Sequence, residues 1–134
     1  MKKEVNVSKK MLKNKGFKLE KGELSYYEKF RLVMSFTTSP ETLARLVNDE
    51  SWVVRRGVAF NPNTPIETLE RLANDESWVV RSWVARNLNT PPETLTCLAN
   101  DDECSVRRGV AWNSNTPQYI KDYLKIKEFL NYYD

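Results

Sequence analysis

The sequence predicts an all-α protein, a short α-solenoid of three full 26-residue helical hairpins with partial capping repeats at both ends. Three observations support this fold class: a gapless internal repeat, an apolar spacing typical of two short helices per repeat, and turn residues between them. Helices of about ten residues are marginal alone. We therefore expect them to persist by stacking on their neighbours, as repeat arrays do.

Self-comparison reveals three complete copies. The first and second share 18 of 26 positions, the second and third 15, and the first and third 16. Leu24–Phe36 matches the second half of a preceding unit, and Thr116 restarts the first half. We expect a basic N-terminal arm or cap at 1–22 and a helical-repeat domain at 23–134, with repeats at 39–64, 65–90 and 91–116 and caps at 23–38 and 117–134.

The first half of each repeat predicts a short helix. Thr38, Thr64 and Thr90 each begin a Thr-x-x-Glu pattern, which predicts a capping box in which the hydroxyl accepts a backbone N–H. Pro65 and Pro91 follow at the expected first helical position, where proline's missing donor costs nothing. Leucines then recur on one face, led by Leu43, Leu69 and Leu95.

The second half predicts a helix over Ser51–Phe60, Ser77–Arg86 and Glu103–Trp112. An Asn-Asp pair precedes each of these helices and is expected to end the first helix and cap the second. Each ends in Asn-x-Asn-Thr, where we expect asparagine in a left-handed or turn conformation. Residues identical in all three copies form one apolar stripe and are the candidate core: Val54, Val80, Val106, Val58, Val84, Val110, Ala59, Ala85 and Ala111.

These patterns resemble the leucine-rich repeat variant family, whose signature is close to D-x-x-x-x-V-R-x-x-V-A-x-N-x-N-T-P. It stands here from Asp49, again from Asp75 and, less completely, from Asp101. The resemblance covers roughly Leu24 to Leu124 and implies a right-handed superhelix, related to HEAT repeats, in which one helix is often of the 3₁₀ type. Some family members carry a cysteine-rich iron–sulfur segment ahead of the repeats. No cysteine precedes Cys97, so we expect no cofactor.

Arg55, Arg81 and Arg107 each follow an aspartate by six residues. One interpretation is a basic stripe for phosphate. We favour a ladder of salt bridges between adjacent repeats, as in HEAT-like solenoids, because a planar guanidinium can serve two carboxylates. The acidic clusters at 49–50, 75–76 and 101–103 are expected to cap helix N-termini rather than to bind a metal.

Positions that differ between the three copies are not constrained by the packing that all repeats share. On the second helices they lie on one face and include large aromatics and arginines, a composition typical of recognition surfaces. We call these six residues the ribbon: Arg56, Phe60, Trp83, Arg86, Arg108 and Trp112. The alternative is that the aromatics fill gaps between copies, with Gly57 and Gly109 making room. Trp52 and Trp78 are expected to pack beneath the turn between the two helices.

Composition excludes several classes of function. The 134 residues include no histidine, which removes Ser-His and Cys-His hydrolases and His-ligated metals. Cys97 and Cys104 make neither a disulfide framework nor a four-ligand zinc site. No membrane span or secretory signal is evident, so we expect a cytoplasmic protein. No motif pairs a carboxylate with a substrate cleft, and we expect no catalysis and no metal.

The N-terminal residues 1–22 contain eight lysines and two glutamates, a net +6. Because the chain totals +3, the remainder is +3 − 6 = −3. A lysine-rich arm attracts polyanions, although it also serves as a solvated tail or polar cap. We expect a module that binds another protein through the ribbon. The alternative is nucleic-acid binding through the ribbon arginines and the lysine-rich arm, Lys2, Lys3, Lys9, Lys10, Lys13 and Lys15 among them.

Overall fold

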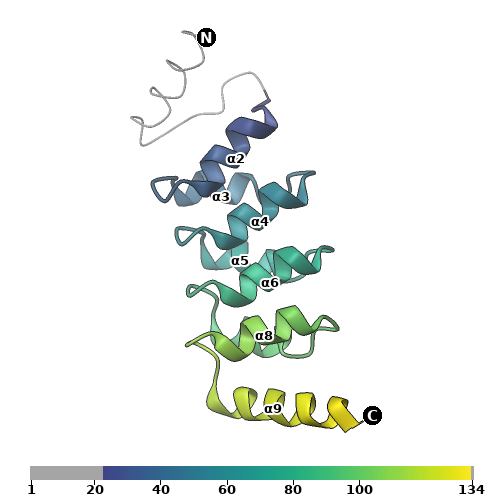
Figure 1. The fold of residues 1–134 in the computed structure, drawn as a ribbon. Helices are drawn as coiled ribbons and strands as arrows, with labels where there is room; N and C mark the ends of the chain where they lie inside the picture. The colour runs from purple at the N-terminus through teal and green to yellow at the C-terminus, as the bar shows by residue number, and fades with distance from the viewer. Residues whose placement is uncertain (1–22, 134) are drawn as a thin grey trace.

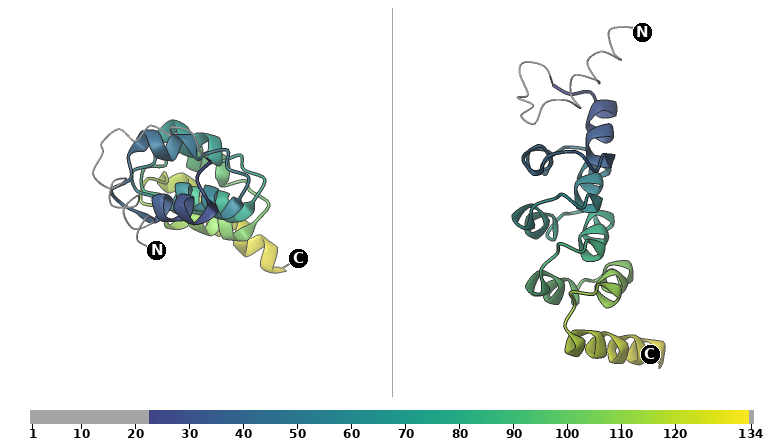
Figure 2. Two further views of the ribbon diagram at one scale, coloured as in Figure 1. Left: turned by 90° about the horizontal axis from the view of Figure 1, so that it is seen from above. Right: turned by 90° about the vertical axis from the view of Figure 1, so that its left-hand side faces the viewer.

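The computed structural model describes residues 23–133, and every regular element in that part of the chain is a helix. The second helices of successive units form one layer and the first helices form the other (Figure 1, Figure 2). The front layer of Figure 1 consists of α2 (Tyr26–Met34), α4 (Trp52–Phe60), α6 (Trp78–Arg86) and α8 (Cys104–Trp112). The rear layer consists of α3 (Pro40–Arg45), α5 (Ile66–Leu72) and α7 (Pro92–Leu98). The predicted fold class, a helical-repeat solenoid, is confirmed.

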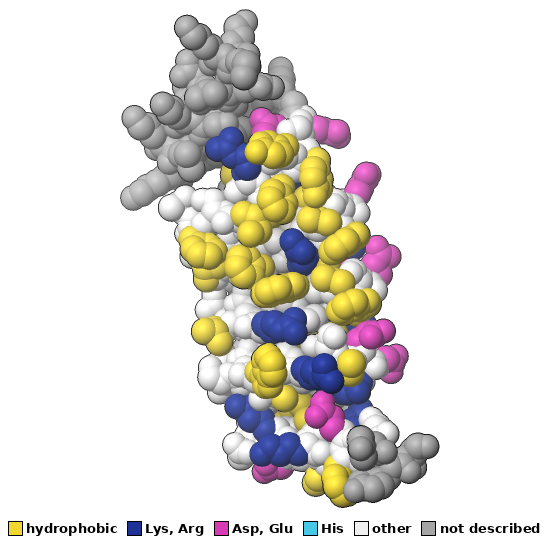
Figure 3. All heavy atoms as spheres, in the orientation of Figure 1, with side chains coloured by type: hydrophobic (Ala, Val, Ile, Leu, Met, Phe, Trp, Pro, Cys, Tyr) yellow, Lys and Arg dark blue, Asp and Glu magenta, His cyan; other side chains and the backbone are white. Residues whose placement is uncertain are grey.

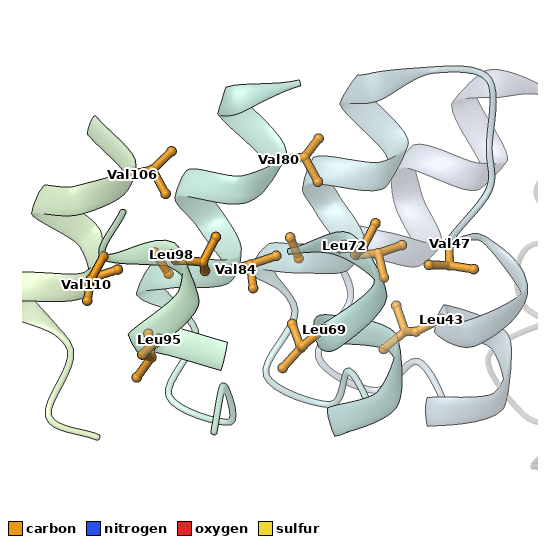
Figure 4. Close-up of a cluster of buried hydrophobic side chains, with 14 of the residues drawn as sticks. Leu43, Val47, Leu69, Leu72, Val80, Val84, Leu95, Leu98, Val106 and Val110 are labelled. Carbon is orange, nitrogen blue, oxygen red and sulfur yellow. The ribbon is translucent and has the colours of Figure 1, made fainter. Parts of the chain in front are cut away.

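The core lies between the two layers and runs the length of the stack. Valines from the second helices face leucines from the first, as Figure 4 shows for Val84, Leu72 and Leu69. The predicted valines at the six invariant positions are fully buried, and so are Leu43, Leu69 and Leu95. Ala59 and Ala85 are also fully buried, whereas Ala111 is partly buried against the same cluster. Each repeat therefore packs its two helices through the same valine and leucine positions.

The capping-box prediction is wrong. The Thr64 hydroxyl donates to the carbonyl oxygen of Val58 at 2.6 Å, so it satisfies the end of the preceding helix instead of the start of the next. Thr38, Thr90 and Thr116 do the same for their preceding helices. A helix leaves orphan groups at both ends, and a threonine between two helices can serve either one. The threonine hydroxyl acts as a donor here, and the last carbonyl groups of a helix need donors because they have no partner within the helix.

The first helices also begin and wind differently from the expectation. Pro65 and Pro91 are N-cap residues, one position before the first helical residue, and Ser39 caps α3 by accepting the N–H of Thr42. All three are short α-helices rather than 3₁₀ helices. Their last turns tighten, however: the N–H of Leu46, for example, bonds the carbonyl of Leu43.

A buried asparagine joins each second helix to the unit before it. The Asn87 amide donates to the carbonyl oxygens of Ala59 at 2.8 Å and Asn61 at 3.1 Å, while its own oxygen accepts the Asn89 N–H. Asn61 and Asn113 make equivalent bonds. Of the two conformations expected for these asparagines, the left-handed one is wrong, because their backbone is extended (φ near −70°). The turn is present: the carbonyl of Asn87, for example, accepts the N–H of Thr90. The buried asparagines hold adjacent units in register.

Two glycines allow close approach of neighbouring second helices. A Cβ on Gly57 would lie 2.2 Å from Cγ2 of Val33, and one on Gly109 would lie 2.8 Å from Cβ of Ala85. The alternative in which these glycines make room for aromatic side chains is therefore wrong, because the space is taken by Val33 and Ala85.

The final helix, α9 (Gln118–Tyr133), lies across the end of the stack (Figure 2). Ile120 and Leu124 are buried against the core, and the Tyr123 hydroxyl donates to the Asn100 side chain at 2.9 Å. Ile126 and Leu130, by contrast, are about 60% exposed. The helix covers the end of the core with its first two turns and leaves its far half exposed.

Candidate functional site

The invariant arginines form the predicted ladder between units. Arg55 donates through Nε and Nη2 to the two oxygens of Asp75, at 2.7 and 3.1 Å, and Arg81 does the same to Asp101. The remaining Nη1 of Arg55 donates to the carbonyls of Asp49 and Glu50 in its own unit. Arg55 and Arg81 therefore each join two adjacent units, and the competing interpretation as a phosphate-binding stripe fails for these two arginines because their guanidinium forks are occupied.

The two ends of the ladder differ from its middle. Lys29 occupies the arginine position in the first partial unit and bridges Asp49 at 2.7 Å. At the other end, Lys127 stands where the next aspartate would be, and the buried Nε of Arg107 has no hydrogen-bond partner among the described residues. The repeat pattern thus ends at α9.

The ladder shifts the pKa values of its members. Burial raises the pKa of the Asp101 carboxyl, but the bond from Arg81, the N–H of Glu103 and nearby arginine charge outweigh it, so the net pKa is lowered. Asp49 shows the same balance, with Lys29 and the N–H of Ser51 as donors. The hydrogen bond to Asp101 in turn raises the pKa of Arg81. These carboxylates are ionised bridges at neutral pH, and each also accepts an N–H at the start of the following helix.

The structure brings three of the six ribbon residues into one cluster. Phe60 and Trp83 meet edge to face with ring centroids 5.2 Å apart, and the Arg86 guanidinium lies 5.4 Å from the Trp83 ring. Phe36, which the sequence interpretation missed, extends the cluster by packing 6.1 Å from Phe60. Phe60 and Trp83 are half-buried, whereas Arg86 and Phe36 are exposed. Aromatic contacts thus run from the α2–α3 turn to α6.

Arg86 is held in place from three sides. Its guanidinium lies over Trp83, its Nη1 donates to the Ser82 hydroxyl, and its stem reaches the next layer, where a Cβ on Gly109 would meet Cγ of Arg86 at 3.4 Å. A guanidinium has five N–H donors in a fixed plane. Because the residue is exposed, the donors that Ser82 leaves unused are open to a second acceptor.

The other ribbon residues lie on the same layer outside this cluster. Arg56 lies 6.0 Å from the Trp52 ring, and Arg108 and Trp112 are exposed on α8, Trp112 to 80%. The prediction that Trp52 and Trp78 pack beneath a turn is wrong, because each is 45% exposed at the first residue of its helix. Helical spacing could have predicted this exposure. Trp52 lies four residues before the variable position Arg56, and residues four apart lie on the same face of a helix.

Apolar, basic and acidic side chains lie on different parts of the surface formed by the second helices. In Figure 3, hydrophobic side chains crowd the part of the surface over α2 and α4, and Lys and Arg side chains line the middle toward α8. Asp and Glu side chains follow one edge in the same view. The turns before α4, α6 and α8 carry exposed acidic residues, Glu50, Glu76, Asp102 and Glu103. We call this whole surface, formed by α2, α4, α6 and α8, the ribbon face.

The remaining candidate features do not form a catalytic or ligand-binding arrangement. Cys97 and Cys104 are free and exposed. Cys97 borders an open polar hollow of about 430 Å³ beside α7 whose wall includes Arg81 and Asp101, both already paired. Within the described residues, no group of three Cys, Asp or Glu side chains is arranged to hold a metal ion, and no helix is long and apolar enough to cross a membrane. The six candidate lysines, from Lys2 to Lys15, lie outside the described residues.

Stacked helical hairpins, an inter-unit arginine ladder and an asparagine ladder define a helical-repeat scaffold. The model of one family, described as leucine rich repeat variant, matches residues 52–77 and 78–103. These two adjacent segments therefore match the leucine rich repeat variant repeat, and the resemblance predicted from the sequence is confirmed over them. Neither the curated proteins nor the solved structures include a significant match.

Proposed function

We propose that this protein is a non-catalytic binding module that uses the ribbon face to bind another protein. The observation that carries the proposal is the set of contacting aromatic and arginine side chains that runs from the α2–α3 turn to α6 while remaining at least partly exposed, with exposed Arg108 and Trp112 on α8 beyond it. Exposed apolar patches often mark interaction sites, and Trp and Arg are enriched among the residues that dominate the energetics of interfaces.

Affinity capture from the native host, compared by quantitative mass spectrometry between variants, tests this proposal. Trp112→Ala combined with Arg86→Glu is expected to lose the captured partner, because both side chains are exposed and their replacement leaves the core intact. Ile66→Ala is the matched control, since Ile66 is 49% exposed but lies on α5 in the opposite layer. Equal capture by all three proteins would contradict the proposal.

Nucleic-acid binding is the second candidate, and the observation that favours it is the net +6 of residues 1–22. Such binding would rest on phosphate neutralisation and would weaken steeply as salt rises. Titration of a labelled DNA duplex and an RNA duplex at 50 and 200 mM salt, with the full chain and a chain lacking residues 1–22, tests it. Binding that is insensitive to salt or absent at low salt would exclude this function.

A further inference from the structure

We propose that the partner is an amphipathic, acidic protein segment that lies along the stack, with apolar side chains over α2 and α4 and carboxylates over Arg86 and Arg108. This inference rests on the proposed function and adds the chemistry and the direction of the bound segment. Its basis is the uneven distribution of apolar, basic and acidic side chains over the ribbon face.

The apolar end of the site is built from rings at the start of the stack. Tyr26, Tyr27 and Phe36 are each more than half exposed, and Trp52 is nearly so. A stacked contact between Tyr26 and Phe30 and a tilted contact between Phe36 and Phe60 hold two of these rings in place. Rigid aromatic rings lose little conformational entropy when they bind an apolar side chain.

The basic end is pre-organised for a carboxylate. Arg86 is fixed by Trp83, Ser82 and the α8 backbone near Gly109, so little of its freedom remains to be lost on binding. Its planar fork is exposed and suits the two oxygens of an aspartate or glutamate. Arg108, exposed on the next layer, places a second positive charge farther along the same line.

A protein segment fits the charges better than a nucleic acid does. Acidic side chains follow one edge of the ribbon face and would repel a phosphate backbone. The turns before α4, α6 and α8 contribute exposed acidic residues, Glu50, Glu76, Asp102 and Glu103. Residues 23–134 sum to −3, which adds to this repulsion. A peptide with separate apolar and acidic parts avoids the conflict, because its charge can lie over the exposed Arg86 and Arg108.

The length of the segment follows from the stack. Four layers of helices about 10 Å apart span about 30 Å between the outermost axes. That distance corresponds to about nine residues of extended chain or about 20 residues of helix. The carboxylates are expected mainly toward one end of the segment, because the exposed Arg86 and Arg108 lie on the last two layers. Arg56 on α4, by contrast, is half-buried and lies over the Trp52 ring.

A random 20-residue peptide display library, selected against the full chain, tests the inference without knowledge of the natural partner. The expected result is enrichment of peptides that join aromatic or aliphatic residues to Asp or Glu at one end. Against Arg86→Glu/Arg108→Glu, acidic peptides are expected to lose at least tenfold in enrichment, with Lys and Arg taking their place. Peptides selected on the wild type should also lose at least tenfold in affinity for this variant. Ile66→Glu, at a position 49% exposed on α5 in the opposite layer, controls for added negative charge.

The possible outcomes separate the inference from the proposed function. Enriched peptides that depend on Phe36 and Trp112 but ignore the arginine reversals would overturn the inference and leave protein binding in place. Absence of any selective enrichment would count against both. Tighter binding of an RNA or DNA duplex than of any selected peptide, lost in Arg86→Glu/Arg108→Glu, would replace the acidic segment with a nucleic acid. Circular dichroism of each variant establishes that it is folded.

Discussion

At the scale of single residues, buried polar side chains join adjacent units alongside the apolar core. Asn87 is nearly buried and satisfies two carbonyl oxygens of the preceding unit, while Arg81 satisfies a carboxylate of the following one. An unsatisfied buried polar group costs about 1 to 3 kcal/mol. A shift in the register between units would leave these buried groups without partners, so their hydrogen bonds favour the observed register.

Replacement of Asn87 is expected to be costly. Asn87→Ala leaves the carbonyls of Ala59 and Asn61 without their donor in a buried site, so we expect a loss of about 3 kcal/mol in the free energy of unfolding. Urea denaturation measures this loss. Asn89→Ala is the matched control, because Asn89 is exposed and its amide bonds the carbonyl of Pro62 near solvent, and it should lose less than 1 kcal/mol. Similar losses in the two variants would contradict the register role.

The lowered pKa of Asp101 predicts a defined pH dependence. Because the carboxyl has a lower pKa in the folded chain than in the unfolded one, its bridge to Arg81 contributes stability above the unfolded value, near pH 4. That contribution is lost as the pH falls through the folded pKa. Between pH 5 and pH 2, Asp101→Asn should therefore lose less stability than the wild type in urea titrations. Asp102→Asn should follow the wild type, since Asp102 contributes only its backbone carbonyl to Arg107. A steeper acid loss in Asp101→Asn would contradict the assignment.

At the scale of helices, the sequence predicted most of the architecture and missed the connections between units. The second helices begin one residue after the predicted starts and end where expected, because the same apolar stripe recurs three times. The role of Thr64 was misassigned because Thr-x-x-Glu fits both a helix start and a helix end. The contacts of Asn87 were missed because its partners lie 26 and 28 residues earlier, beyond the reach of any local pattern.

The candidate site was also predicted only in part from the sequence. Variation between copies identified the half-exposed Phe60 and Trp83 and the exposed Arg86, and the structure brings these three together. It did not identify Phe36, which lies before the first full repeat and has no aligned aromatic copy. Nor did it identify Trp52 as exposed, because identity between two copies indicated burial. A shared residue can thus serve the surface as well as the core.

Glycine in a second helix predicts an unusual response to alanine. Alanine normally stabilises a helix by about 1 kcal/mol relative to glycine. At Gly57, however, the added Cβ would overlap Val33, which is fully buried and has no space to move. We therefore expect Gly57→Ala to destabilise the protein by about 2 kcal/mol.

A double-mutant cycle with Val33→Ala checks the cause. Val33→Ala alone removes buried volume and should destabilise the protein, but it also removes the atoms that overlap the new Cβ. The double variant Gly57→Ala/Val33→Ala should lose less stability than the sum of the single losses, by about 1 kcal/mol or more. Additive losses would show that the contact between α2 and α4 is not the source of the effect.

At the scale of the whole molecule, stability is distributed along a line. Each unit contacts its neighbours in the stack, so the array resembles a one-dimensional chain of interfaces rather than one globular core. α6 has a second helix packed on both sides, α4 and α8, whereas the far half of α9 exposes Ile126 and Leu130. Opening is therefore expected to begin at the ends.

Amide hydrogen exchange of the full chain tests this gradient. Residues in α6, such as Val84, should exchange slowest, and α9 beyond Lys125 should exchange fastest, because local opening there breaks few buried contacts. Gly57→Ala should then lower the protection of α2 far more than that of α8, since the overlap is confined to the interface between α2 and α4. If the variant instead lost protection equally in every helix, the stack would unfold as a single cooperative unit and the linear description would be wrong.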